Sequence, residues 1–142
     1  MKLHEEIDET IKELQRCKDA IMQSELPPDR LSNAVVIMSG HLIRLGSFIA
    51  DLVYDANNAY IYRKFKYASD FNTLSKELSG ATMRELDNKA QIQNKEHHEV
   101  EIEKRRTADR VKTLHEDYRL FIMTIQTKLS VIKSELFSKN PI

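Results

Sequence analysis

The stretch "LSNAVVIMSGHLIRLGSFIADLVYDANNA" (residues 31–59) carries the clearest repeat in the chain. Apolar or small side chains recur in it at alternating steps of four and three, namely Leu31, Val35, Met38, Leu42, Leu45, Ile49, Leu52, Ala56 and Ala59. A heptad repeat kept over about four heptads is typical of a helix that packs knobs-into-holes against another helix. Phe48 and Val53 widen the stripe, so we expect this helix to be buried on more than one side.

Similar stripes flank this stretch and predict a helix on each side. Residues 3–25 have apolar side chains at helical spacing and charged residues elsewhere, and Pro27 and Pro28 end the pattern because proline cannot continue a helix. The apolar positions of this first stripe are Leu3, Ile7, Ile11, Leu14, Cys17 and Ile21. We therefore predict helices over about 3–25 and about 30–78.

A third helix is predicted over about 83–138. Gly80 can end the preceding helix, and Thr82 with Glu85 has the spacing of a capping box. A tight apolar seam resumes further on, at Val111, Leu114, Tyr118, Phe121, Ile125, Leu129, Ile132 and Leu136. Unbroken, this helix of about 55 residues would be about 80 Å long, whereas a compact domain of this chain length is about 30 Å across. We expect an elongated molecule, a kinked helix, or both.

These elements predict an all-α fold in a single domain over 1–142. Its architecture is an elongated antiparallel hairpin of two long helices with coiled-coil-like packing, plus an N-terminal amphipathic helix. Only 3 Gly and 3 Pro, with 31% charged residues, agree with long solvated helices. Such a hairpin leaves apolar seams exposed, so we expect a homo-oligomer.

Composition excludes several classes of protein. With 22 basic and 22 acidic residues the formal charge is zero, which excludes a strongly basic nucleic-acid arm and an acidic DNA mimic. A local bias remains, because residues 63–112 hold 12 basic and 9 acidic groups. Cys17 is the single cysteine, so neither an internal disulfide nor a cysteine metal cluster can form. We see no signal peptide and no apolar stretch of roughly 20 residues, and we expect a cytoplasmic protein with no membrane partner.

Catalysis is the least supported function. "KEHHEVEIE" (95–103) places His97 and Glu101 one helical turn apart, where they could share a metal ion. Both the Glu-x-x-His spacing of di-iron bundles and the His-Glu-x-x-His pattern of metalloproteases are missing, as is a Gly-rich phosphate loop. A solvated charged face is the simpler interpretation. We expect no enzyme, no catalytic residue, no metal site and no cofactor.

The stretch "NNAYIYRKFKY" (57–67) raises the main functional question. Continued past Ala59, the apolar seam reaches Arg63 and Lys66, and cations are unfavourable in a dry seam. The seam must therefore leave the core or open to water or a ligand. We expect Ile61 and Phe65 to be core residues. A separate helix face combines Tyr60, Lys64, Tyr67 and Phe71.

A face that mixes rings with cations suits single-stranded nucleic acid, where bases stack and cations follow the backbone. It also suits the solvated edge of a helical core. A second basic cluster lies in "EKRRTADRVK" (103–112) and comprises Lys104, Arg105, Arg106 and Arg110. This cluster could bind phosphate, or it could be a solubilising face with local ion pairs. If the hairpin turns at 79–82, the cluster lies opposite residues 49–57.

The layout resembles the UvsY-type recombination mediators of bacteriophages, which are small all-helical proteins. The likeness spans about residues 31–136 and lies in "NAVVIMSGHLI" (33–43), "YRKFKY" (62–67) and "LSVIKS" (129–134). Residues 1–26 and 93–103 have no counterpart in it. The resemblance implies an oligomeric protein that binds single-stranded DNA, helps load a RecA-type recombinase and displaces single-strand-binding protein.

On that resemblance, Arg63, Lys64 and Lys66 would contact phosphate, and Tyr60, Tyr62 or Tyr67 would stack on bases. The leading hypothesis is a non-catalytic, phage-like accessory protein of DNA recombination or replication, acting in the host cytoplasm. The alternative is a coiled-coil adaptor, structural or inhibitory protein that binds a protein partner and no nucleic acid.

Overall fold

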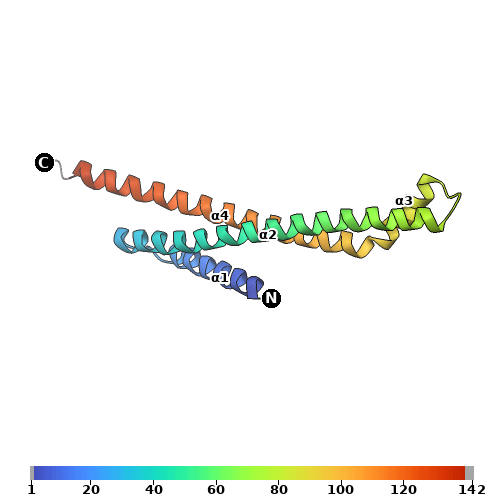
Figure 1. Ribbon diagram of the computed structural model, residues 1–142. Helices are drawn as coiled ribbons and strands as arrows, with labels where there is room; N and C mark the ends of the chain where they lie inside the picture. Colours follow the sequence, from blue (N-terminus) through green and yellow to red (C-terminus); the bar gives the residue numbers. More distant parts are fainter. Residues whose placement is uncertain (1, 140–142) are drawn as a thin grey trace. The chain divides into compact units, whose positions relative to one another are not determined.

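A computed structural model describes residues 2–139, and over these residues the chain forms helices and no strand (Figure 1). The helices are α1 (Lys2–Gln23), α2 (Pro28–Glu77), α3 (Met83–Gln93) and α4 (Lys95–Lys139). The all-α class is thus confirmed. The first two helices begin and end within two residues of the predicted positions.

The breaks around α2 arise from the residues that predicted them. Pro28 is the first residue of α2, a position where its missing N–H costs no intrahelical bond. Gly80 has a φ of 88°, in the left-handed region that favours glycine after a helix. Thr82 and Glu85 form the predicted capping box, since each backbone N–H donates to the other side chain, at 3.3 and 3.2 Å.

The prediction of one unbroken helix over 83–138 was wrong, because Asn94 separates α3 from α4. Asn94 is 3% exposed, and its backbone N–H donates to Ala90 O at 3.1 Å. Its side-chain Nδ2 donates to Asp70 Oδ2 at 2.7 Å and to Ala90 O at 3.1 Å. A side chain that competes for backbone acceptors in this way favours a helix end over helix continuation.

The chain divides into two compact units. Among the described residues, unit one comprises 2–49 and 111–139, and unit two comprises Ala50–Arg110. Helices α2 and α4 contribute residues to both units.

In unit one, α1 lies beside the first part of α2 (Figure 1), and the second part of α4 belongs to the same unit. The predicted stripes supply most of the buried apolar side chains, which are Ile7, Leu14, Ile21, Leu31, Val35, Met38, Leu45, Phe48, Val111, Tyr118, Ile125 and Leu129. Ile122 is also buried, although the prediction placed the neighbouring Phe121 in the seam. Leu136, predicted to continue the seam, is exposed. The Tyr118 hydroxyl donates to Gln15 Oε1 at 2.8 Å, which ties α4 to α1. A Cβ added at Gly46 would lie 3.2 Å from His115 Nε2, so a side chain of α4 approaches α2 closely there.

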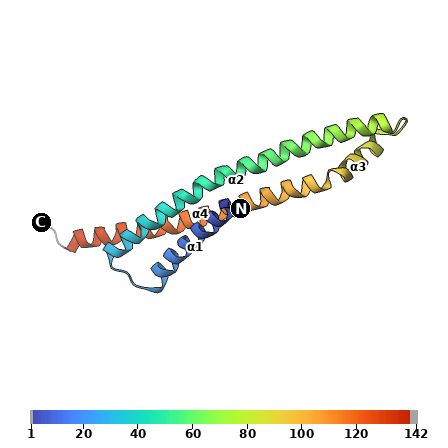
Figure 2. The same ribbon diagram turned by 60° about the horizontal axis from the view of Figure 1, so that its bottom comes forward.

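In unit two, the second half of α2 lies beside α3 and the first half of α4 (Figure 2). A small apolar cluster, formed by Leu74, Leu86 and Ala90 with half-buried Tyr67 and Phe71, packs α3 against α2. The Arg105 guanidinium donates to Asn57 Oδ1 at 3.2 Å, and Arg63 pairs with Glu101. These pairs show α2 and α4 running antiparallel in unit two and confirm that residues 104–112 begin opposite residues 49–57.

The expectation that no segment is apolar enough to span a bilayer was wrong for α2. One 18-residue window of α2 has a mean hydropathy of 1.5, which passes that test by length and composition. Only 28% of the window is buried. Mostly buried core helices of soluble proteins pass the same test, whereas this window of α2 leaves most of its surface uncovered.

Candidate nucleic-acid interface

Arg63 occupies the seam position that the sequence predicted, but it is neither in a dry core nor free for a ligand. Its guanidinium Nε donates to Glu101 Oε2 across the α2–α4 seam, and His98 Nδ1 lies 3.5 Å from the same carboxylate oxygen. The Arg63 and Glu101 side chains are 23% and 13% exposed. The seam of unit two therefore becomes polar by pairing its charges.

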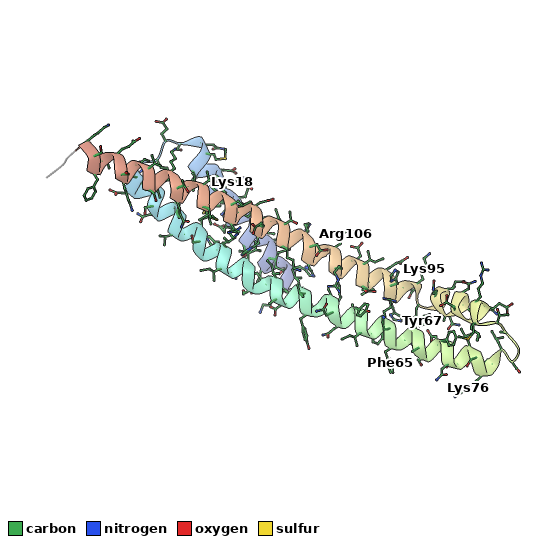
Figure 3. All side chains as sticks on the ribbon, turned by 90° about the horizontal axis from the view of Figure 1, so that it is seen from above. Lys18, Phe65, Tyr67, Lys76, Lys95 and Arg106 are labelled. Carbon is green, nitrogen blue, oxygen red and sulfur yellow. The ribbon has the colours of Figure 1, made fainter. Side chains whose placement is uncertain are left out.

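Tyr67 is held between helices of unit two. Its hydroxyl donates to Asp87 Oδ1 of α3, and this hydrogen bond, followed by burial, raises the pKa of Tyr67 above its ordinary value. The ring packs on Phe71 with centroids 6.1 Å apart. Figure 3 shows Tyr67 pointing into the space between the helices. The ring is thus fixed in position rather than free to swing out toward a base.

The predicted face that mixes rings and cations is present on α2. Lys64 Nζ lies 5.1 Å from the centroid of the Tyr60 ring, and Arg63 Cζ lies 5.4 Å from it. Cations at these distances are attracted to the ring by its quadrupole. Tyr60 therefore carries intramolecular cations on its ring, and stacking of a base there would have to displace at least one of them.

The prediction that Ile61 and Phe65 are core residues was wrong. Ile61 is 63% exposed and Phe65 is 69% exposed. Phe65 points away from α4 in Figure 3. The reason is the helical register, because buried positions follow Ala56 in phase with Arg63 rather than with Ile61 and Phe65.

Tyr62 is half exposed, and its ring meets the His97 ring edge-on at 5.0 Å. This contact engages one of the two histidines of the charged stretch 95–103. Among residues 2–139, no three histidine, cysteine, aspartate or glutamate side chains are grouped as a metal ion would require.

The basic cluster of α4 is spread over different sides of the helix. Arg105 points toward α2, where it donates to Asn57, whereas Arg106 points away from α2 (Figure 3) and pairs with Glu103 at 2.8 Å. Lys104 and Arg110 are exposed. Arg105 contacts α2 six residues before Arg63, about 9 Å along the helix. The cations of this cluster therefore do not share one side of α4.

A cleft of about 860 Å³ lies next to the mixed face of α2, within unit two. Its lining residues come from α2, α3 and the start of α4, and they are Arg63, Lys64, Tyr67, Asp87, Asn88, Gln91, Ile92, Asn94, Lys95 and His98. The break at Asn94 lies in its wall. Three lining side chains are cations, whereas Asp87 is the single carboxylate among them.

The cleft brings together three of the nine predicted nucleic-acid residues, namely Arg63, Lys64 and Tyr67. Sequence reasoning missed the residues that α3 and Lys95 contribute, because the predicted third helix had no break. The polar run of residues 93–103 could have indicated this break. A segment without an apolar stripe has no continuous seam that packs it against α2.

Comparison of the chain with protein-family models, with curated proteins and with solved structures finds no significant match.

Proposed function

We propose that the protein binds single-stranded DNA and acts, without catalysis of its own, as an accessory factor in DNA recombination or replication. The observation that carries the proposal is the mixed face of α2, where Tyr60, Lys64 and Tyr67 lie on one side of the helix. Lys64 and Tyr67 also line a cleft whose other residues include two further cations and three side-chain amides. Single strands are bound by this combination of aromatic platforms and cationic grooves.

The side-chain contacts alter the roles of individual residues within this proposal. Arg63 and Tyr67 shape the site through Glu101 and Asp87, so they support it rather than reach outward. Lys64 and Lys95 supply phosphate contacts.

Repetition around an oligomer would strengthen a weak charge bias. The formal charge of the chain is zero, so one copy supplies only a short basic track. Several copies would repeat the track, and phosphate contacts made together release more counterions. A RecA-type recombinase and single-strand-binding protein are the partners that the resemblance to UvsY-type mediators implies.

The test is a fluorescence-anisotropy titration of a labelled oligo-dT strand at low and moderate salt. We expect binding that weakens steeply with salt, and at least tenfold weaker binding by the Lys64→Glu/Lys66→Glu variant. Lys128→Glu/Lys133→Glu is a matched control, because it makes the same charge change at two exposed positions in unit one. If the folded Lys64→Glu/Lys66→Glu variant binds as well as the parent, the assignment of this stretch is wrong.

A second function, that of a coiled-coil adaptor for a protein partner, is favoured by a different observation. Tyr54, Ile61 and Phe65 are all strongly exposed and are spaced seven and four residues apart, so they share the side of α2 opposite the seam. Exposed apolar patches of this kind mark protein interfaces, where aromatic side chains are frequent anchors. Absence of DNA binding at low salt would favour this function.

Self-association is proposed for either function, with this exposed side of α2 as the contact. Sedimentation equilibrium at micromolar concentration should give a mass above the 16.6 kDa of one chain. Ile61→Ser/Phe65→Ser should shift the mass toward one chain without loss of helicity. A parent protein that sediments as a monomer contradicts the proposal.

A further inference from the structure

We propose that the cleft of unit two receives one unstacked nucleotide of a bound strand, with the phosphate at Lys64 and Lys95 and the base beside Tyr67 and Ile92. The inference rests on the proposed function and specifies how its site works. It adds residues of α3 and α4 to a site that the sequence placed on α2 and on residues 104–110.

The size and walls of the cleft suit a small ligand. About 860 Å³ is within the range of small-molecule sites, which usually combine apolar walls with a few polar groups. Here Tyr67 and Ile92 supply the apolar surface, and the side-chain amides of Asn88 and Gln91 supply donors and acceptors. A base has an apolar face and a polar edge, so it matches both kinds of wall.

Two cations of the rim have no carboxylate partner within the described residues, and one of them, Lys64, also contacts the Tyr60 ring. Lys64 and Lys95 are exposed, and neither forms an ion pair with any residue from 2 to 139. The single carboxylate of the lining, Asp87, accepts hydrogen bonds from Tyr67 and Gln91 and is therefore already engaged. Lysine binds phosphate as a flexible point charge, and two lysines can follow a backbone that turns into the cleft.

The ring of the site is fixed before any ligand arrives. Tyr67 is held by its hydrogen bond to Asp87 at one end and by Phe71 along the ring. Ordering a side chain on binding costs affinity, so a ring already in place gives more of its stacking energy to the ligand. Ile92, 73% exposed on the rim, gains cover when a base enters.

The ligand class follows from these features. A base within a duplex is stacked on both faces and cannot enter a cleft between helices without leaving the stack. A flexible single strand can direct one base into the cleft at little cost. The cleft therefore favours single-stranded over duplex DNA, and it does so without recognising a particular base sequence.

The experiment compares a labelled oligo-dT strand with an abasic strand of the same length, which keeps every phosphate and lacks every base. Each strand is titrated with the full-length parent, with Gln91→Ala/Ile92→Ala, and with Met83→Ala/Gln93→Ala. The last variant is a matched control, because it removes an amide and an apolar side chain from exposed positions of the same helix that do not line the cleft.

We expect the parent and the control to bind oligo-dT about tenfold or more tightly than the abasic strand. Gln91→Ala/Ile92→Ala should reduce this ratio of affinities to about two or less. Lys95→Ala should lower the slope of log affinity against log salt concentration by about one phosphate contact, whereas its control Lys89→Ala should leave the slope unchanged. Tight binding of oligo-dT by Gln91→Ala/Ile92→Ala with the full ratio intact overturns the inference and leaves the proposed function standing. Failure of the parent to bind either strand overturns both.

Discussion

The pair formed by Arg63 and Glu101 predicts a stability effect at a position where the sequence suggested a DNA contact. Replacing Arg63 with alanine leaves the Glu101 carboxylate, 13% exposed, without its charged partner. Exposed pairs contribute about 0.2–1 kcal/mol, whereas removing one partner of a fully buried pair costs about 3–5 kcal/mol. Since this pair is only partly buried, we expect the free energy of unfolding to fall by about 1–3 kcal/mol.

Thermal unfolding followed by circular dichroism measures this loss. For a chain of this length, 1 kcal/mol corresponds to about 2–4 °C, so Arg63→Ala should lower the Tm by roughly 2–12 °C. Glu101→Ala should have an effect of similar size, and the double variant should lose less than the sum of the two. Arg63→Met/Glu101→Leu replaces the pair by apolar groups of similar volume and should lie within about 1 kcal/mol of the parent.

The same variants separate support from direct binding. Folded Arg63→Ala should bind oligo-dT within about threefold of the parent, because its guanidinium is engaged by Glu101. An Arg63→Ala variant with an unchanged Tm and tenfold weaker DNA binding would refute this reasoning. It would mean that Arg63 contacts phosphate, as the resemblance implied.

Three further predictions concern single side chains. Leu45→Ala should lower the free energy of unfolding by about 2–5 kcal/mol in urea titrations, because Leu45 is fully buried in unit one; a loss below 1 kcal/mol would contradict its place in the core. Gly46→Ala should raise the free energy of unfolding by up to about 1 kcal/mol through helix propensity, but only in a His115→Ala background, because His115 Nε2 would lie 3.2 Å from the new Cβ. The two changes should therefore be non-additive in a double-mutant cycle. The Asp87 hydrogen bond raises the pKa of Tyr67, so its stabilisation is complete below the unfolded tyrosine pKa of about 10 and is lost as pH rises through the folded pKa. Stability of the parent should therefore fall more steeply than that of Tyr67→Phe above about pH 10, and equal slopes would mean that the hydrogen bond is absent in solution.

The elements of the fold were predictable because local chemistry determines them. The seam from Leu31 to Ala59, the start of α2 at Pro28 and the capping box at Thr82 each follow from periodicity or from a single side chain. The break at Asn94 was not predictable from local pattern, because it depends on a hydrogen bond to Asp70, 24 residues away. Long-range partners of this kind leave no mark in a helical repeat.

The candidate site was predictable only in part, for a related reason. The mixed face of Tyr60, Lys64 and Tyr67 follows from helical spacing, and the structure has it. Ile61 and Phe65 were assigned to the core by residue type, although the seam that passes through Arg63 was already out of phase with them. In this segment the register, rather than hydrophobicity, decides which side chains are buried.

The polar seam of unit two also fixes the alignment of its two long helices. An apolar seam of similar side chains tolerates a slip of one heptad, because each side chain then packs into an equivalent site seven residues along the partner helix. A slip of seven residues here would move Arg63 away from Glu101 and bring that carboxylate opposite Ala56 or Asp70. Opposite Ala56, the Glu101 carboxylate would have no charged partner, and opposite Asp70 it would face a second carboxylate. A polar pair in the seam of unit two therefore buries less apolar surface but favours one register of α2 against α4. In that register, Lys64 and Lys95 line the same cleft.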